Sequence, residues 1–351
     1  MRNSPRQTAG HRPVHCPCSR TTPREIAMSE HYTLADLRRA ERIQILHPQF
    51  STALERLSHS HALSRQGAAA RHLLLIGASG TGKTSVLHSF AKQHPSYETE
   101  EATIRPVVYV QVPAHPTIRG LAEAILIALG AGVQLRGSTA EKTNQIVQLI
   151  RNGKTEALLL DEFHHFVDAG RRTFEEVTEW LKTLIDQIAI PTVLSGLPEC
   201  EWILRSNEQL RRRFAARVAL TPIGFSCNAD KSLFRDVVHA WDTQINQGRP
   251  TWGLAEWECV RRLHYASNGL LGYLSKVILG ALECLIEQER HDLDQSVLAM
   301  AFSNYVWRGS PPELNPFDAN FVFRRLNQPD EPFEPTRFSR RNAPKAAIPA
   351  L

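Results

Sequence analysis

The chain has 351 residues, of which 42% are hydrophobic and 22% charged, and this composition excludes a fibrous or wholly disordered protein. The length is sufficient for one large folded domain and a smaller one. A formal net charge of +5 permits nucleic acid as a partner without requiring it. The longest apolar run, residues 121–129, has about half the length of a membrane span, so we expect no membrane association.

The N-terminal segment and the cysteines give few structural signals. Residues 1–32 combine Pro, Arg, Thr and His without periodicity and lack the apolar stretch of a secretory signal. We expect this segment to be disordered, with Met28 as a possible true start of translation. Only Cys16 and Cys18 of the six cysteines are close in sequence, a pattern that favours reduced thiols in a cytoplasmic protein over a metal site.

Two helices are predicted before the first strand. Thr33 is a suitable cap for the first helix, and the second follows His47-Pro48. The run Leu73-Leu74-Leu75-Ile76 then ends in a glycine, which is typical of a short strand buried on both faces.

Strands and helices alternate in the next part of the chain. Strands are predicted at residues 107–112, 157–160 and 191–194, and helices at residues 121–129, 146–150 and 174–188. This alternation predicts an α/β fold with three layers, in which a parallel sheet lies between helices.

The chain changes character after the core, which we assign to residues 33–222. Residues 223–308 show only helical periodicity and predict a small all-helical domain. From residue 309 onward prolines are dense and periodicity is lost. We therefore expect residues 309–351 to form a basic, Pro-rich, extended tail.

A glycine-rich segment between a predicted strand and a predicted helix reads Gly77-Ala78-Ser79-Gly80-Thr81-Gly82-Lys83-Thr84. Glycines allow the backbone N–H groups of such a loop to surround a phosphate. In this pattern the ammonium of Lys83 lies between the β and γ phosphates of ATP, and the hydroxyl of Thr84 binds Mg²⁺. We predict an ATP and Mg²⁺ site here that includes Ser85. The alternative is an ordinary glycine-rich turn.

The strand at residues 157–160 ends in two carboxylates. Asp161 is predicted to hold Mg²⁺ through water, and Glu162 to orient and activate the attacking water. The alternative is an acidic helix cap after a buried strand. His164 and His165 follow. Because adjacent side chains point to different faces, we expect no shared metal ion and assign the two histidines no catalytic role.

Ser195 and an arginine run are further candidates. Ser195 ends the strand at residues 191–194, which should lie beside the Asp161 strand or the Gly77 strand, where a hydroxyl can touch the γ-phosphate or the attacking water. A strand-ending Ser-Gly turn is the alternative. The run Arg211-Arg212-Arg213 before Phe214 is either a solvated helix face or the source of a guanidinium that acts in a neighbouring subunit.

In this order, these features resemble the AAA+ ATPases and, within them, the TniB/TnsC transposition regulators. The similarity rests on two segments before the P-loop, on the P-loop itself, on the acidic pair with its two histidines, on residues 190–199 and on the arginine run. The two early segments are Glu41-Arg42-Ile43 and His47-Pro48-Gln49-Phe50. The resemblance covers about residues 33–307 of the chain.

The resemblance implies a P-loop AAA+ core with a helical lid over residues 223–308. It also implies an ATP-dependent regulator that assembles into rings or helical filaments on double-stranded target DNA. Its further partners would be a TniA-like transposase, which it recruits or activates, and a TniQ-like target-selection protein. ATP would lie between protomers, with Arg213 as the trans-acting arginine finger, Arg212 second to it, and Ser195 at the sensor position.

The resemblance also bears on the lid and on DNA. Where many AAA+ proteins have a sensor arginine in the lid, this chain has Ser275. Lys276 follows, but one helical step turns it about 100° away, so we do not expect it to replace the arginine. Family members bind DNA with the region after the second strand, which implies Thr117 and Arg119 as phosphate contacts. An ordinary surface loop with a helix cap is the alternative.

Two other functions remain open from the sequence. One is a non-hydrolysing scaffold that uses ATP only to hold oligomers together. The other is an AAA+ ATPase of secretion or signalling that shares this core but has no role on DNA.

Overall fold

A computed structural model describes residues 31–132 and 136–335. Its central element is a five-stranded parallel sheet with the strand order β4-β5-β6-β1-β7. The strands are β1 (Leu73–Gly77), β4 (Val107–Gln111), β5 (Ala157–Asp161), β6 (Thr192–Gly196) and β7 (Ala216–Leu220). Since all five strands run in the same direction, their carboxyl ends meet at one edge of the sheet.

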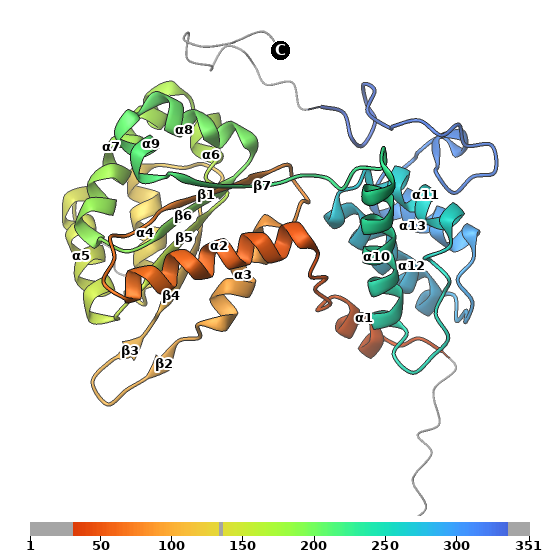
Figure 1. The fold of residues 1–351 in the computed structure, drawn as a ribbon, viewed down its shortest axis with the longest axis horizontal. Helices are drawn as coiled ribbons and strands as arrows, with labels where there is room; N and C mark the ends of the chain where they lie inside the picture. Colours follow the sequence, from red (N-terminus) through yellow and green to blue (C-terminus); the bar gives the residue numbers. More distant parts are fainter. Residues whose placement is uncertain (1–30, 133–135, 336–351) are drawn as a thin grey trace, which may run out of the picture.

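Helices cover both faces of this sheet (Figure 1). One face carries Leu74 and Ile76 of β1 and packs against α4 (Ile118–Ala128), α5 (Thr139–Asn152) and α7 (Arg171–Ile188). The other face carries Leu73 and Leu75 and packs against α2 (Pro48–Arg65) and α3 (Lys83–Gln93). The apolar runs predicted as buried strands are therefore buried on both sides, and the three-layer α/β prediction is confirmed.

Some elements of this domain were not predicted. The edge strand β7 pairs with β1 over its whole length, from Leu73 opposite Ala216 to Gly77 opposite Leu220. A short hairpin of β2 (Tyr97–Glu98) and β3 (Thr103–Ile104) projects from the sheet domain in Figure 1. The remaining short helices are α6 (His165–Asp168), η1 (Pro198–Cys200), α8 (Glu201–Ser206) and α9 (Glu208–Arg213).

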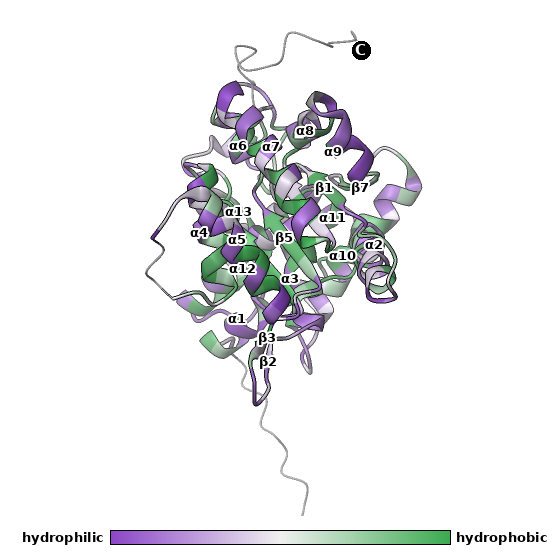
Figure 2. Ribbon diagram, turned by 90° about the vertical axis from the view of Figure 1, so that its left-hand side faces the viewer, coloured by the Kyte–Doolittle hydropathy of each residue, from purple (hydrophilic) through white to green (hydrophobic). Residues whose placement is uncertain are grey.

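A second body of helices follows the sheet, as predicted. It contains α10 (Asn228–Ile245), α11 (Trp257–Ser267), α12 (Leu271–Glu287) and α13 (Gln295–Tyr305). Their apolar faces form a separate core that includes Phe234, Leu274 and Phe302. Figure 2 shows hydrophobic colour along α12 and the central strands, and hydrophilic colour on the outer helix α9.

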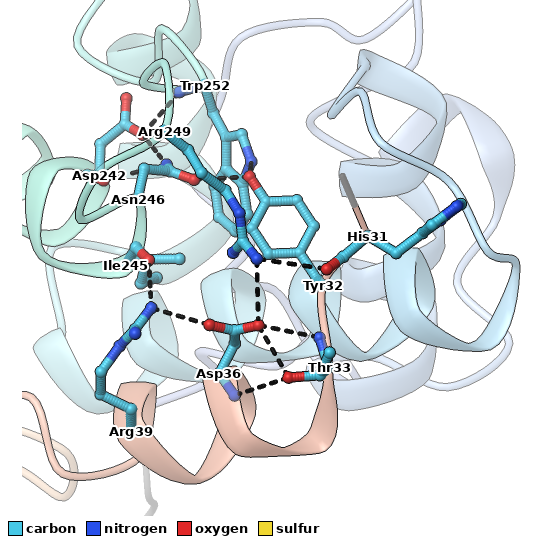
Figure 3. Close-up of polar contacts among 10 residues, drawn as sticks. All are labelled: His31, Tyr32, Thr33, Asp36, Arg39, Asp242, Ile245, Asn246, Arg249 and Trp252. Carbon is cyan, nitrogen blue, oxygen red and sulfur yellow. Dashed lines mark hydrogen bonds and ion pairs between the residues drawn. The ribbon is translucent and has the colours of Figure 1, made fainter. Parts of the chain in front are cut away.

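The first helix, α1 (Leu34–Ala40), belongs with this helical domain and not with the sheet. Thr33 caps α1 as predicted, in a capping box with Asp36. Asp36 also faces Arg249, and the hydroxyl of Tyr32 donates to Asn246 and accepts from Trp252 (Figure 3). The assignment of α1 to the core is therefore wrong, and so is disorder up to residue 32, because Tyr32 is buried in the helical domain.

The C-terminal segment also differs from expectation. Residues 309–335 contain only one short helix, η2 (Pro312–Leu314), yet they pack on the helical domain. Phe317, Phe321 and Phe333 are buried in its core, and Arg262 donates to the carbonyls of Pro316 and Asp318. The expectation of an extended tail is wrong for residues 309–335, because aromatic side chains anchor this proline-rich chain. The basic residues after Pro335 lie outside the described residues. The same is true of Met28, Cys16 and Cys18.

Within the described ranges, no single helix combines the length and the apolar composition of a membrane span. Helices α11 and α12 reach that length and composition only as a pair, across a bend of 115°.

Candidate nucleotide-binding site

The P-loop connects the carboxyl end of β1 to the amino end of α3. Gly80 and Gly82 have left-handed backbone conformations, with φ of +79° and +96°, which glycine adopts without strain. A Cβ atom on Gly77 would lie 2.4 Å from the carbonyl oxygen of Leu220 and 2.6 Å from Oγ1 of Thr81. The backbone conformation at Gly80 and Gly82 and the close contact at Gly77 therefore favour glycine at all three positions.

Lys83 begins α3 and is buried beneath the loop. Its Nζ donates to the carbonyls of Gly77 and Ala78, at 2.8 and 3.1 Å. Burial lowers the pKa of Lys83, and the carboxylates of Glu162 and Asp161 oppose that shift. The ammonium is thus held at the point where the helix also presents its unpaired N–H groups, a combination that suits a phosphate.

Asp161 ends β5 and is completely buried. One of its carboxylate oxygens accepts from the hydroxyls of Thr84 at 2.7 Å and Tyr109 at 3.1 Å, and the other accepts from the backbone N–H of Glu162 at 2.9 Å. Burial is the main cause that raises the pKa of Tyr109, and the negative charge of Asp161 raises it further. The hydroxyl therefore remains a donor. The structure therefore brings together Thr84 and Asp161, the two predicted Mg²⁺ ligands.

Glu162 follows in a left-handed conformation with φ of +56°, which is uncommon for a residue other than glycine. Its Oε2 lies 3.0 Å from Nδ1 of His164, whose pKa is lowered mainly by burial. The ring centroids of His164 and His165 lie 4.5 Å apart, so the expectation that the two rings diverge is wrong. Both Glu162 and His164 line the same cavity as Lys83.

Ser195 lies in β6, which pairs with both β5 and β1, whereas the sequence predicted a neighbour in one or the other. It is completely buried, and its Oγ has no hydrogen-bond partner among the described residues. Its backbone carbonyl accepts from the N–H of Phe163, which fixes β6 to the segment after Asp161. A buried hydroxyl without a partner is costly, so a water or phosphate oxygen within reach would satisfy it.

A cavity of about 540 Å³ connects the P-loop with the helical domain and the segment before α2. This volume is in the range of small-molecule sites. Its phosphate end is lined by Ser79, Gly80, Gly82, Lys83, Thr84 and Ser85. Its other end is lined by the apolar side chains of Ile43, Ile45, Trp241 and Leu271, which suit a base.

The helical domain touches the P-loop directly. The backbone N–H of Gly272, at the start of α12, donates to the carbonyl of Gly80 at 2.8 Å. A Cβ on Gly272 would lie 2.9 Å from the Cα of Gly80. Ser275 lines the cavity, whereas the ammonium of Lys276 lies over the ring of Tyr273, 4.8 Å from its centroid. Lys276 therefore does not take the place of a lid arginine.

No role was predicted for His47 and Gln49, at the start of α2. Gln49 exchanges hydrogen bonds with Thr221 at the end of β7, and His47 is buried with an Nδ1 atom that has no partner among the described residues. Burial lowers the pKa of His47, which favours the neutral ring. The segment His47-Pro48-Gln49-Phe50 was noted in the sequence, but only the three-dimensional arrangement shows that His47 and Phe50 line the cavity.

The arginine candidates lie elsewhere in the protomer. Arg213 makes two hydrogen bonds to Asp186, at 2.9 and 2.7 Å, and Arg212 pairs with Glu208. They precede β7, whose first residue pairs with Leu73, so they lie toward the amino end of β1, opposite the P-loop. The structure does not bring them together with Lys83 within one chain.

The DNA candidates lie at the start of α4. The hydroxyl of Thr117 accepts from the N–H of Gly120 and caps the helix, as in the helix-cap alternative. Arg119 is exposed and pairs with Glu123 at 3.0 Å, and the same carboxylate oxygen lies 3.4 Å from Nζ of Lys142. Neither residue lines the nucleotide cavity.

The P-loop end of the cavity fits a Mg²⁺–nucleotide. Gly80 and Gly82 have the left-handed backbone conformations of the loop, and the buried ammonium of Lys83 lies beneath it. Thr84 and Asp161 supply the oxygen ligands that Mg²⁺ prefers.

Comparisons with known proteins agree with this arrangement. The fold is similar to that of the Aeropyrum pernix ORC2 protein, with a TM-score of 0.57 and 14% identity, covering 78% of this chain and 73% of that chain. It is also similar to the Aeropyrum pernix ORC1 protein in complex with DNA, with a TM-score of 0.57 and 16% identity, covering 75% and 67%. These similarities confirm the predicted P-loop AAA+ architecture.

Sequence comparison finds a curated relative in the ATP-binding subunit ClpL of an ATP-dependent Clp protease from Lactococcus lactis. It is 29% identical over 146 residues, which cover 40% of this chain but only 17% of that protein. The family model of the bacterial TniB protein matches residues 37–221, just over half of the chain. The chain that carries this nucleotide cavity therefore belongs to the TniB family.

Proposed function

We propose that this protein is an ATP-dependent, DNA-binding AAA+ regulator of transposition. It hydrolyses ATP with Mg²⁺, oligomerises on target DNA, and recruits or activates a transposase. The observation that carries the ATPase part is the cavity in which Lys83, Thr84 and Glu162 meet. TniB-family membership supports the role in transposition, and the fold similarity to an ORC1 protein in complex with DNA supports a DNA partner.

The residues of the cavity have separate tasks in this proposal. Lys83 and the backbone N–H groups of the P-loop orient the phosphates and balance their charge. Thr84 and Asp161 would hold Mg²⁺, which supplies further positive charge to the phosphate oxygens when bound. The carboxylate of Glu162 accepts a proton from the attacking water, and Oγ of Ser195 is available to hydrogen-bond that water or a phosphate oxygen.

Phosphate release with and without double-stranded DNA tests the activity. Glu162→Gln should lower turnover by about 10²–10⁴-fold, the usual contribution of a general base, and leave ATP binding intact. Glu98→Gln, on the exposed β2–β3 hairpin, is the control. No release at all would favour the non-hydrolysing scaffold, and release that does not depend on Glu162 would refute its role as the base.

Arg213 is proposed to act in the active site of a neighbouring protomer, with Arg212 second. Its hydrogen bonds to Asp186 offer a purely structural explanation, because they join α9 to α7. Asp186→Ala separates the two roles, since it breaks the same pair but keeps the guanidinium. A finger predicts that Arg213→Ala abolishes turnover while Asp186→Ala retains it. Equal loss of stability and turnover in both variants would leave only the structural role.

DNA binding is proposed to involve backbone phosphates, with Arg119 exchanging Glu123 for a phosphate and Thr117 beside it. Arg119→Glu should weaken binding and reduce the salt dependence by about one counterion per contact. Arg172→Glu is a matched control, because Arg172 makes a similar pair with Glu176 at 2.9 Å on α7. If the two variants bind DNA equally well, Arg119 is not a contact.

The self-assembly and the partners follow from the same proposal. Electron microscopy of the protein with an ATP analogue and duplex DNA should show DNA-bound rings or filaments. Their absence would favour the AAA+ ATPase without a DNA role. Co-sedimentation of such assemblies with a TniA-like transposase and a TniQ-like protein tests the remaining partners.

A further inference from the structure

Three side chains next to the Mg²⁺ ligands form a second group of potential ligands. Glu162, His164 and His165 each offer one ligand atom, and these atoms lie within 4.8 Å of one another. Oε2 of Glu162 and Nδ1 of His164 are already 3.0 Å apart. Ligand atoms around a tetrahedral Zn²⁺ lie roughly 3.3 Å apart, given metal–ligand distances of about 2.0–2.1 Å. Small side-chain rotations of the third ligand would therefore complete the set.

The chemistry of this group differs from that of the Mg²⁺ ligands. Thr84 and Asp161 offer only oxygen atoms, which suit Mg²⁺, whereas two imidazoles with one carboxylate suit Zn²⁺ and similar borderline cations. Asp161 is completely buried and already accepts three hydrogen bonds, so it belongs to the first set. The two sets share the same strand end but select different metals.

The surroundings of His165 support a ligand role. Its Nδ1 lies 3.2 Å from the backbone carbonyl of Val112, at the end of the neighbouring strand. A histidine that binds a metal usually donates its other ring N–H to such a carbonyl, which fixes the tautomer and leaves Nε2 for the metal. All three side chains are half-buried, which limits competition from water.

We propose that Glu162, His164 and His165 form a binding site for Zn²⁺ or a similar transition metal ion, and that occupancy of this site stops ATP hydrolysis. Three protein ligands leave one position of a tetrahedral site open. Two of the three ligands, Glu162 and His164, line the nucleotide cavity, so the proposed site lies at the wall of that cavity. A Glu162 carboxylate that is bound to the metal cannot accept a proton from the attacking water, while Lys83 and the P-loop still bind nucleotide. The inhibition rests on the proposed ATPase function, but the metal site does not.

Co²⁺ titration of the full-length protein tests the site directly, because Co²⁺ replaces Zn²⁺ and absorbs visible light when its geometry is tetrahedral or five-coordinate. The protein should carry Cys16→Ser and Cys18→Ser, so that these thiols do not bind the metal. We expect saturation at one Co²⁺ per chain and reversal by Zn²⁺. His165→Ala should weaken binding about tenfold or more, while His239→Ala, an exposed histidine on α10, should not.

A parallel measurement of phosphate release separates the two proposals. Zn²⁺ should inhibit release by the parent protein and by His239→Ala, and His165→Ala should hydrolyse ATP but resist inhibition. No visible Co²⁺ bands, or bands unchanged in His165→Ala, would overturn the metal site whatever the activity. Normal Co²⁺ bands in a protein that never hydrolyses ATP would instead refute the ATPase function and leave the site standing.

Discussion

The contact between Gly272 and Gly80 allows a quantitative prediction about the lid. In Gly272→Ala, the new Cβ would lie 2.9 Å from the Cα of Gly80 and 3.2 Å from its carbonyl oxygen, both of which are backbone atoms. Carbon atoms in contact normally lie about 3.5–4.0 Å apart, so α12 must move away from the P-loop. That movement breaks the 2.8 Å hydrogen bond from Gly272 N–H to Gly80.

The expected result is weaker nucleotide binding without a loss of folding stability. A hydrogen bond of this kind contributes about 1 kcal/mol, which corresponds to a roughly fivefold higher Kd for ATP. Alanine at a helical position is more favourable than glycine by roughly 0.5–1 kcal/mol, so the thermal midpoint of the nucleotide-free protein should not fall. Isothermal titration calorimetry and thermal unfolding measure the two effects.

Gly132→Ala is the control, because apart from its chain neighbours no atom of the described residues lies within 4 Å of the new Cβ, and the backbone φ of Gly132 is not positive. It should change neither quantity. If Gly272→Ala binds ATP within twofold of the parent protein, the lid and the P-loop can separate here without affecting the site, and the reasoning fails.

Three further predictions concern binding, pH and packing. Lys83→Ala should abolish the stabilisation by Mg²⁺–ATP, which amounts to about 2.7 kcal/mol at a ligand concentration of 100 Kd, as measured by thermal shift. Burial, followed by the charge of Arg213, lowers the pKa of His72 to about 4, so protonation favours the unfolded chain. Acidification from pH 7 to 5 should therefore lower the free energy of unfolding, measured with urea, by about 2 kcal/mol. His72→Gln should remove this contribution of His72 to the pH dependence. Phe317→Ala should cost about 3 kcal/mol, whereas Val322→Ala, at an exposed position, should be neutral.

Each of these has a contrary outcome. A normal ATP-dependent thermal shift in Lys83→Ala would place the phosphates elsewhere. An unchanged pH dependence in His72→Gln would mean that other groups account for acid destabilisation. A neutral Phe317→Ala would show that residues 309–335 contribute nothing to the stability of the helical domain.

The nucleotide site could be predicted from the sequence because its signals are local. Residues 77–84 combine a buried strand, a glycine loop and a helix start, and Asp161 follows a second buried strand. Parallel strands bring such carboxyl ends together whatever the rest of the chain does. The strand of Ser195 was predicted beside one of these two strands, and in the sheet it pairs with both.

The errors concern elements that depend on distant contacts. Strand β7 has five residues, includes the charged Arg217, and alternates between exposed and buried positions from Arg217 onward. It therefore lacks the continuous apolar run from which the inner strands were predicted. Residues 309–335 have no periodicity, and only the positions of Phe317, Phe321 and Phe333 show that they are anchored. Pairs such as Arg213 with Asp186, 27 residues apart, have no sequence pattern at all.

The strand order has a consequence for the synthesis of the protein. β1 leads into the P-loop and pairs only with β6 and β7 in the described sheet. Leu73 of β1 lies opposite Val193 of β6 on one side and Ala216 of β7 on the other. During translation, Leu73 is made long before either partner exists. More than a hundred further residues must therefore be synthesised before the apolar β1 segment and the glycine loop have a strand to pair with. The pair β4–β5 can form earlier. The strands on both sides of β1 are thus completed late in biosynthesis, once β7 has been made.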